Sequence, residues 1–238
     1  MSSGLRNAYR RAVDLLYPPR CVGCGAFETF LCDPCAASMM STAVGERCPN
    51  CSARWDGGLN CPRCFSCEGL DAMTGAFDME GVARQLVHAI KYRGVRDLAP
   101  LMAARMHPLR ERRAFDVAVA VPLHRSREKH RGFNQAADIL RHTGWPQLEG
   151  SLLRVRKTDT QVGMKPGERR ANISNAFRWR GPSLDGLSVA VVDDVITTGA
   201  TANECARVLR ENGARHVVAL AFARANYEPA ATDVPILD

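Results

Sequence analysis

Apolar residues recur at helical spacing in four segments of the chain beyond residue 74. Helices are predicted, in chain order, over 79–92, 98–106, 134–142 and 200–212. The first of them carries its apolar face on four residues: Val82, Leu86, Val87 and Ile90. Gly213 follows the last segment, at the place where a helix commonly ends in a left-handed residue.

Short continuous apolar runs separate these helices. They cover residues 117–121, 187–192 and 217–223, and each has the length of a strand buried on both faces. Strands that alternate with helices are typical of an α/β fold with a mostly parallel sheet flanked by helices. Ligands of such folds bind outside the carboxyl ends of the strands. The segments that follow the first two strands are therefore where a site is expected.

Residues 1–19 have an amphipathic pattern. Five apolar residues lie at helical spacing among arginines: Leu5, Tyr9, Ala12, Val13 and Leu16. We expect a short helix that packs on its own protein; a helix on a membrane surface is the alternative. The scattered arginines argue against a secretory signal, and no apolar run approaches the roughly 18 residues of a membrane span. We expect a cytoplasmic protein, with a peripheral position at the inner membrane as the alternative.

Nine of the ten cysteines lie in one segment, residues 21–67. Eight of them form four Cys-x-x-Cys pairs: Cys21 and Cys24, Cys32 and Cys35, Cys48 and Cys51, Cys61 and Cys64. Each pair supplies two sulfurs to a tetrahedral ion, so two pairs complete a Zn²⁺ site. Four pairs predict two structural zinc ions in a small module that the metal holds together. The alternatives are a disulfide framework, which requires an oxidising compartment, and a redox-active dithiol.

The spacing does not say which pairs share an ion. Sequential pairing, first with second and third with fourth, gives a double zinc ribbon over 20–70, and we prefer it to crossed pairing. Cys67 repeats the spacing after Cys64 and could replace a ligand, whereas Cys205 lies on the apolar side of a predicted helix and is expected in the core. The rest of the chain divides into an α/β domain over 74–226 and a tail over 227–238.

Basic residues are concentrated in the second half of the chain. The formal net charge is +7, and eight thiolates on two zinc ions would lower it to about +3. The distribution is more informative, because residues 154–180 hold eight Lys and Arg against two acids, and residues 125–131 hold four against one. We expect an anionic ligand near these segments; a solvated basic loop is the alternative for the first.

Two adjacent aspartates, Asp193 and Asp194, end the second predicted strand and precede a Thr-Thr-Gly turn. The turn has the hydroxyls, the helix N-terminal amides and the glycine of a phosphate cradle, on five residues: Thr197, Thr198, Gly199, Ala200 and Thr201. The two carboxylates would accept hydrogen bonds from the vicinal hydroxyls of a ribose whose 5′-phosphate lies in the turn. Helix capping or a Mg²⁺ site is the alternative for the acid pair.

The segment 189–201 closely resembles the phosphoribosyl-pyrophosphate signature of the type I phosphoribosyltransferases. The four cysteine pairs and two more motifs precede it, Ile90-Lys91-Tyr92-Arg93-Gly94 and Arg131-Gly132-Phe133-Asn134-Gln135. Together, and in this order over nearly the whole chain, they resemble the ComF family of competence proteins.

The resemblance implies a type I phosphoribosyltransferase-like domain that binds phosphoribosyl pyrophosphate together with Mg²⁺. It places a pyrophosphate loop after the first predicted strand, where Arg125 and Arg131 become candidate ligands. It also implies a lid over 158–172, from which Gln161 and Arg169 reach the ligand. Because little chain follows the last strand, we expect the zinc module to cap this site and to select the partner.

Three functions stay open. The family implies a protein that binds phosphoribosyl pyrophosphate and takes part in handling single-stranded DNA in natural competence; a competence helicase is the candidate protein partner, above all for the regulator described last. The alternative is an active phosphoribosyltransferase with an unknown nitrogenous acceptor in nucleotide metabolism. The third is a regulator in which the level of the nucleotide precursor gates a partner protein. Fold alone does not choose among them.

Overall fold

The computed structural model describes residues 18–43, 47–48, 50–54, 61, 69–158 and 172–225. Its strands are β1 (Ala72–Asp78), β2 (Val117–Ala120), β3 (Leu152–Arg154), β4 (Phe177–Trp179), β5 (Ser188–Ile196) and β6 (His216–Arg224). Its helices are α2 (Asp33–Ala37), α3 (Gly81–Tyr92), α4 (Leu98–Arg112), α5 (Arg125–Arg131), α6 (Gln135–Thr143) and α8 (Ala200–Glu211).

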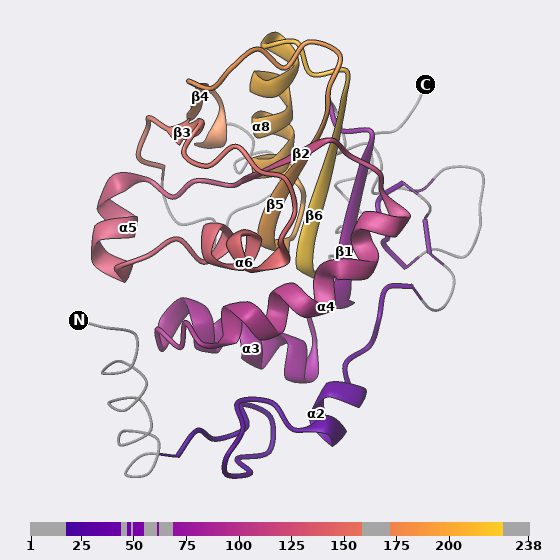
Figure 1. Ribbon diagram of the computed structural model, residues 1–238, viewed down its shortest axis with the longest axis vertical. Helices are drawn as coiled ribbons and strands as arrows, with labels where there is room; N and C mark the ends of the chain where they lie inside the picture. The colour runs from indigo at the N-terminus through magenta and orange to yellow at the C-terminus, as the bar shows by residue number, and fades with distance from the viewer. Residues whose placement is uncertain are drawn as a thin grey trace, which may run out of the picture.

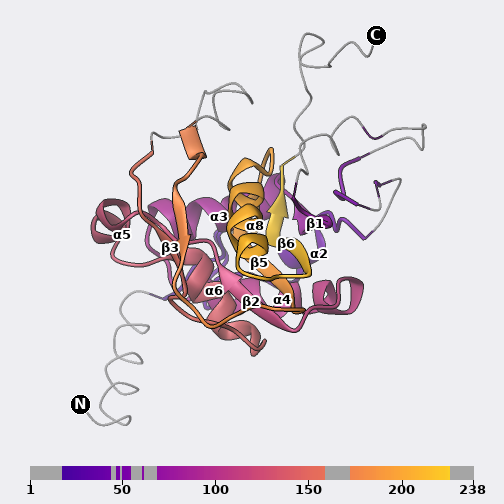
Figure 2. The ribbon, with the colours of Figure 1, turned by 90° about the horizontal axis from the view of Figure 1, so that it is seen from above.

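Four strands form a parallel sheet in the order β1-β6-β5-β2 (Figure 1). The two central strands, β5 and β6, pair from Ser188 with His216 to Ile196 with Arg224. Helices α3, α4 and α6 pack on one face of the sheet, and α8 packs on the other. Figure 2 shows α4 and α6 on the side of the strands away from α8. The antiparallel pair β3–β4 packs beside α8. The predicted α/β class, a mostly parallel sheet flanked by helices, is confirmed.

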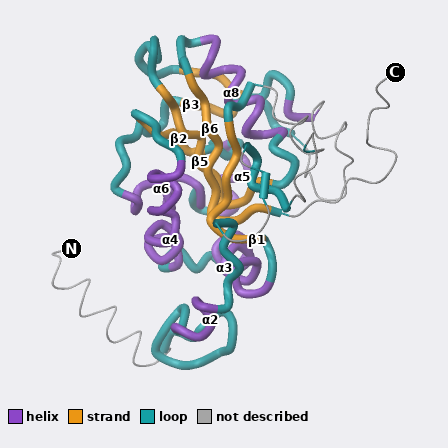
Figure 3. Tube along the Cα trace, turned by 90° about the vertical axis from the view of Figure 1, so that its right-hand side faces the viewer, coloured by secondary structure: helices purple, strands orange, loops and turns teal. Residues whose placement is uncertain are grey.

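Two apolar clusters, one on each face of the sheet, form the core. Figure 3 shows the strands with helices on both sides of them. Alternate residues of β5 enter them, because successive side chains of a strand point to opposite faces. Ala190 and Val192 join the cluster of α3, α4 and α6, whereas Val189 and Val191 join the cluster of α8. Cys205 is 0% exposed in the second cluster, so its predicted place in the core is confirmed.

Strand β1 has no counterpart among the predicted strands. Its sequence, AMTGAFD, lacks a run of branched apolar residues and contains Gly75, which weakens a strand pattern. The glycine is there because the backbone of β6 comes close: a Cβ at Gly75 would stand 2.7 Å from the nitrogen of Arg224. The requirement is set by a residue almost 150 positions away, which a local pattern does not reveal.

Two further expectations differ from the structure. Helix α4 continues past the predicted end at 106 and includes Pro108, because Leu109 is only 1% exposed and anchors the last turn in the core. In the segment after β2, expected to be a pyrophosphate loop, Leu123 and His124 are not helical, and helix α5 begins at Arg125. Gly132 ends α5 in the left-handed region, with φ 84°.

The chain between the second and third cysteine pairs runs along the free edge of β1. The amide of Thr42 donates to the carbonyl of Ala76 at 3.0 Å, and the amide of Asp78 donates to the carbonyl of Met40 at 2.9 Å. This antiparallel contact covers part of a strand edge that would otherwise expose its backbone groups. It also fixes the cysteine-rich segment to the sheet.

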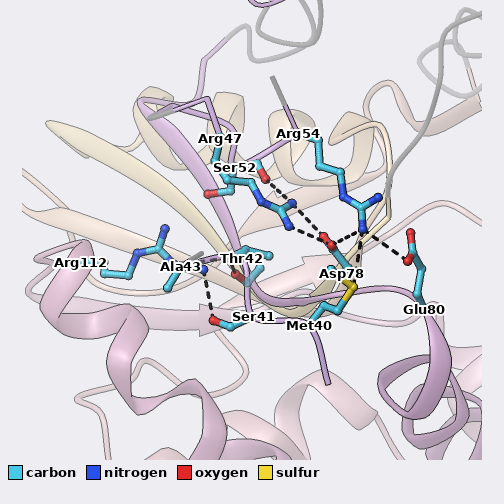
Figure 4. Close-up of polar contacts among 11 residues, drawn as sticks. Met40, Ser41, Thr42, Ala43, Arg47, Ser52, Arg54, Asp78, Glu80 and Arg112 are labelled. Atoms are coloured by element: carbon cyan, nitrogen blue, oxygen red, sulfur yellow. Dashed lines mark hydrogen bonds and ion pairs between the residues drawn. The ribbon is translucent and has the colours of Figure 1, made fainter. Parts of the chain in front are cut away.

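A buried carboxylate strengthens this attachment. The side chain of Asp78, at the end of β1, is 0% exposed and accepts two hydrogen bonds of 2.8 Å from Arg47 and one of 2.8 Å from Arg54 (Figure 4). Burial acts to raise the pKa of Asp78, but the hydrogen bonds from the two guanidinium groups hold that pKa below its ordinary value. Both arginines flank the third cysteine pair, so the carboxylate ties that pair to β1.

Candidate functional site

A cavity of about 850 Å³ opens at the carboxyl ends of β2 and β5. Its walls come from the end of α3, the segment after β2, helix α5, the start of α6 and the turn between β5 and α8. This is the edge at which parallel α/β sheets bind ligands. The predicted residues that line it are Arg131, Asp193, Asp194, Thr197, Gly199, Ala200 and Thr201.

The two aspartates lie within β5 and not after it, since the strand continues to Ile196. Asp194 is 1% exposed. Its Oδ2 lies 2.8 Å from Nζ of Lys91 on α3, and its Oδ1 accepts from Nε2 of Gln135 on α6 at 3.4 Å. Burial acts to raise the pKa of Asp194, but the charge of Lys91 and the hydrogen bonds with Asp193, Lys91 and Gln135 together outweigh it, so that the pKa lies below its ordinary value. Asp194 is therefore an anion held by the protein itself.

The contact with Asp194 also changes the pKa of Lys91. Burial acts to lower its pKa, and the charges of Asp194 and then Asp193 more than offset this, so that the pKa of Lys91 is raised. The cation at the bottom of the site thus stays protonated across the physiological range.

Asp193 is placed differently from its neighbour. It keeps part of its surface accessible at the cavity, and its Oδ1 accepts from the amide of Asp194 at 2.8 Å. Low-dielectric surroundings, and then the negative charge of Asp194, raise the pKa of Asp193 well above its ordinary value. The pKa values of the two neighbouring carboxyls are thus shifted in opposite directions. Both carboxyls have oxygens that can accept hydrogen bonds from a polyhydroxylated ligand.

The turn between β5 and α8 presents a helix N-terminus to the cavity. Gly199 is the N-cap of α8 and has φ 83°, a left-handed conformation that favours glycine. There is also no space for a side chain, because a Cβ at Gly199 would lie 2.6 Å from the sulfur of Met73 on β1. The dipole of the 12-residue helix and its first amides favour an anion at this end. Thr198 does not line the cavity; its Oγ1 accepts from the amide of Ala200 at 3.4 Å.

Helices α5 and α6 extend the polar network around the acid pair. Nη1 of Arg131 donates to Oε1 of Gln135, whose amide group reaches Asp194. Asn134 caps α6, and its Nδ2 donates to the carbonyl of Val121 at 3.0 Å, which ties the end of β2 to the helix. Gln135 thus links the guanidinium of Arg131, which lines the cavity, to the buried carboxylate of Asp194.

A second cavity of about 650 Å³ adjoins the first, and Arg154 of β3 lines both. Nη2 of Arg154 donates to Thr158, whereas its Nε is buried without a hydrogen-bond partner among the described residues. Burial, and then repulsion from Arg127, lower the pKa of Arg154. A buried cationic donor beside a cavity is a group that an anionic ligand would satisfy.

Arg125 stays a predicted diphosphate ligand, but it does not line the same cavity as Arg131. It lines only the second cavity, whereas Arg127 and Arg131 line the first. The reason is the helical conformation of α5: residues four apart share a face, and Arg125 is turned away from it. A loop, as predicted, would not have imposed this separation.

Two functional residues had no predicted role. Lys91 and Gln135 engage the buried aspartate, although both belong to motifs that carried the family resemblance. Their presence in these motifs was the one feature of the sequence that could have marked them. Which groups they contact follows only from the packing of α3 and α6 on one face of the sheet. The lid candidates Gln161 and Arg169 lie outside the described residues.

The cysteines are brought together in two sets. All sulfurs within a set lie within 4.8 Å of one another, and the sets are Cys21, Cys24, Cys32 and Cys35, and Cys48, Cys51 and Cys61. The sulfurs of Cys51 and Cys61 are 3.6 Å apart, as are those of Cys21 and Cys32. A tetrahedral zinc ion with Zn–S bonds of about 2.3 Å spaces its sulfurs about 3.8 Å apart, so both sets fit zinc. The grouping is the sequential one that we preferred; Cys64 and Cys67 lie outside the described residues.

Crowding raises the pKa of several thiols. The side chain of Cys32, and then burial, raise the pKa of Cys35 to about 12. Burial, and then the charge of Cys61, raise the pKa of Cys51 to about 12. Thiols packed this closely ionise together only around a cation, which is the condition that a structural zinc site provides.

The expected cap over the cavity is not formed by the described part of the zinc module. No described residue of 18–61 lines either cavity. The module lies instead along β1 and against α3 (Figure 1). The reason is the edge pairing with β1 and the buried Asp78 contact, which hold the module at the side of the sheet.

Comparison with known proteins agrees with this organisation. The family model described as "Double zinc ribbon domain" matches residues 12–65. "DNA utilization protein YhgH" of Salmonella typhi is 33% identical over 196 residues, which cover 76% of this chain and 86% of that protein. "Competence protein F" of Haemophilus influenzae is 38% identical over 141 residues, covering 56% of this chain and 58% of that protein. "Competence protein ComFC" of Bacillus subtilis is 35% identical over 100 residues, covering 41% and 39%.

Among solved structures, a purine phosphoribosyltransferase from Pyrococcus horikoshii aligns with 60% of this chain and 91% of its own, at 17% sequence identity and a TM-score of 0.30. Among the described residues, no helix has the length and apolar character needed to span a bilayer.

The molecule is thus an α/β protein with a parallel sheet, a polar cavity at the carboxyl ends of its strands and an N-terminal double zinc ribbon with structural zinc. The chain belongs to the ComF family of competence proteins.

Proposed function

We propose that the first cavity binds the ribose 5-phosphate part of phosphoribosyl pyrophosphate, and that the protein uses this site in handling single-stranded DNA during natural competence. The observation that carries the proposal is the convergence of an acid pair and a helix N-terminus on one cavity of about 850 Å³. The diol of the ribose would meet Asp193, and the phosphate would meet the turn at Gly199 and the start of α8. A sugar phosphate is the ligand class that needs both features at once.

The basic residues at the rim support a diphosphate on the same ligand. Arg127 and Arg131 of α5 and Arg154 of β3 line the cavity around the acid pair. Guanidinium groups bind phosphate oxygens through paired donors. We place Mg²⁺ with the diphosphate, since oxygens of phosphate and carboxylate are its preferred ligands.

We assign the structural zinc ions to the two cysteine sets, with Cys64 completing the second. The fit rests on the sulfur spacing within each set. The assignment is tested by counting zinc per chain: two ions are expected in the intact protein, and one after a Cys24→Ser change. Two ions remaining after that change would refute it.

The ligand is tested by titration calorimetry on the zinc-loaded full chain with ribose 5-phosphate, and with phosphoribosyl pyrophosphate plus Mg²⁺. Asp193→Asn removes the carboxyl that would meet the diol and is expected to weaken ribose 5-phosphate at least about 10-fold, since a buried hydrogen-bonding group left without its partner costs about 1–3 kcal/mol. Glu111→Gln is the matched control, because Glu111 is exposed on α4 and does not line the cavity. The proposal would be refuted if the wild-type chain did not bind ribose 5-phosphate at millimolar concentrations, or if Asp193→Asn and Glu111→Gln lowered the affinity equally.

The DNA part of the proposal draws on the relatives, which are named as competence and DNA utilization proteins. Exposed cations beside the cavity are available for a phosphate backbone, on α5 and on the β3–β4 hairpin: Arg125, Lys129, Arg156, Lys157, Arg178 and Arg180. Binding of this kind weakens as salt is raised, with a slope of about −0.7 per phosphate contacted for single strands. A cytoplasmic location and a competence helicase as protein partner belong to the same proposal.

Fluorescence anisotropy with a labelled single-stranded oligonucleotide tests this surface. The double change Arg125→Gln and Lys129→Gln is expected to lower affinity and to reduce the salt slope by about one contact or more. The control Arg84→Gln with Arg112→Gln removes the same charge from exposed positions on α3 and α4. Equal effects of the two pairs would show that net charge alone, and not the α5 surface, governs binding.

A transferase with an unknown nitrogenous acceptor is the second candidate, and the adjoining cavity of about 650 Å³ favours it. The two cavities share Leu123 and Arg154, so a second substrate would lie beside the first. Pyrophosphate release in the presence of phosphoribosyl pyrophosphate, Mg²⁺ and a panel of nitrogenous bases tests it. Release that no base stimulates above simple hydrolysis would exclude the transferase.

A further inference from the structure

The two cysteine sets belong to different cores of the protein. Cys21, of the first set, joins the apolar cluster of α3 and α4. Cys48, Cys51 and Cys61 join the other cluster, which contains Ala200 and Cys205 of α8. The second set is therefore packed on the face of the sheet that carries the phosphate turn, and the first set is not.

Met73 of β1 connects the second set to that turn. Its amide donates to the carbonyl of Asn50, inside the third cysteine pair, at 2.7 Å. Its side chain is 0% exposed and fills the space beneath Gly199, where a Cβ would come within 2.6 Å of the sulfur. A shift of the cysteine pair thus reaches the turn through one residue.

Arg224, at the end of β6, makes a second connection. The residue is 1% exposed. Its Nε donates to the carbonyl of Cys51 at 3.2 Å, and its Nη1 donates to the carbonyl of Ile196 at 3.1 Å and to that of Thr197. The planar guanidinium is rigid, so donors on one group fix the relative positions of all three carbonyls. Ile196 and Thr197 are the residues at which β5 passes into the turn.

We propose that Arg224 is a positioning residue that couples the metal-bound form of the second cysteine set to the phosphate turn, so that the turn has its anion-binding shape only while that set is intact. The expected consequence, a change in sugar-phosphate affinity, rests on the proposed function. The shape of the turn does not, because it can be observed without any ligand. The first set, packed against α3, has no such effect.

The contrast between the sets provides the test. Amide hydrogen exchange over residues 197–203 is measured in the zinc-loaded full chain and in two variants, Cys48→Ser and Cys24→Ser. Cys24 is an exposed member of the first set and Cys48 a buried member of the second. We expect exchange in the turn to rise at least about 10-fold in Cys48→Ser and to stay within about twofold in Cys24→Ser. Equal exchange in the two variants would overturn the coupling.

The guanidinium is tested by Arg224→Lys, which keeps the charge and loses the planar fork. Exchange over 197–203 is expected to rise at least about 10-fold while the zinc content stays at two per chain; unchanged exchange refutes the role of Arg224. If this variant does not fold, the Cys24→Ser protein replaces it, because chelation then removes metal from the second set alone. Loss of protection in the turn on chelation, and its return on adding zinc, are expected, and protection that persists without metal overturns the proposal.

Ribose 5-phosphate titration of the same proteins separates this inference from the proposed function. If the wild-type chain binds, Cys48→Ser and Arg224→Lys are expected to bind at least about 10-fold more weakly, and Cys24→Ser within about twofold. If the wild-type chain does not bind, the proposed ligand is wrong, whereas the exchange measurement still decides whether the second cysteine set shapes the turn.

Discussion

The contact between Lys91 and Asp194 joins the acid pair of β5 to helix α3 at the cavity. Lys91→Met removes the ammonium and keeps a flexible chain of similar length. The carboxylate of Asp194, 2% exposed, then retains Gln135 as a side-chain donor from α6 and has no compensating cation at 2.8 Å. Burial is then opposed only by the hydrogen bonds with Asp193 and Gln135, so the pKa of Asp194 is expected to rise.

The magnitude follows from the burial of the two partners. Removing one partner of a buried ion pair costs about 3–5 kcal/mol. The side chain of Lys91 is 21% exposed, so water recovers part of the loss and we expect about 3 kcal/mol at pH 7.5. For a chain of this length that loss lowers the melting temperature by about 6–12 °C.

The pH dependence of stability provides a second test of the effect of Lys91→Met. In the wild-type protein the pKa of Asp194 is lowered and that of Lys91 is raised, so the stabilisation from the pair is present from above about pH 4 to about pH 10. It is lost as the pH falls through the folded-state pKa of Asp194. In the variant that pKa is raised, so folding takes up a proton and the deficit shrinks as the pH falls from 7.5 to 5.

The assay is thermal and denaturant unfolding of the zinc-loaded protein at both pH values. Asp194→Asn added to Lys91→Met removes the uncompensated charge and is expected to restore stability to within about 1 kcal/mol of wild type. Arg96→Met is the matched control: it takes a half-exposed cation from Asp138, which keeps Arg141, and should cost at most about 1 kcal/mol. A deficit that is equal at pH 5 and pH 7.5, or a double variant no better than the single one, would refute this account of the site.

Three further outcomes are expected. Gly199→Ala should lose about 2 kcal/mol or more, because a left-handed alanine costs about 1–2 kcal/mol and its Cβ displaces the sulfur of Met73; equal stability in urea unfolding would contradict it. Asp78→Asn should cost about 3 kcal/mol or more by leaving Arg47 and Arg54 without their buried anion, and since the pKa of Asp78 is lowered, the loss should shrink below about pH 4. Chelation of both zinc ions should unfold the ribbon and expose its thiols to a colorimetric reagent; thiols that stay unreactive would argue against metal as the support of the module.

Most of the helices and strands were predictable because their signal is local. Apolar residues at helical spacing placed α3, α6 and α8 to within a few residues, and continuous apolar runs placed β2, β5 and β6. Strand β1 was missed because Gly75 is explained by its contact with Arg224 on β6, a constraint that no window around β1 contains. Helix α5 was missed because seven polar residues have no apolar face from which to recognise a helix.

Some residues of the candidate site were likewise predictable from the local sequence, and others were not. The sequence alone revealed the acid pair, Asp193 and Asp194, and the turn at Gly199, because these residues form one continuous motif. Lys91 and Gln135 were not assigned, because they reach the same carboxylate from two helices that are adjacent only after folding.

The amino-acid sequence is sufficient to predict the parallel α/β architecture, the four Cys-x-x-Cys pairs and the acid pair before a glycine turn, because each depends on spacing within a short stretch of chain. Only the folded structure shows the grouping of the cysteine pairs into two sets, the opposite pKa shifts of the two aspartates, the separation of Arg125 from Arg131 and the position of the zinc module at the edge of β1. Those properties depend on distances between segments that are remote in sequence, and electrostatic and packing energies are set by such distances and not by the order of residues.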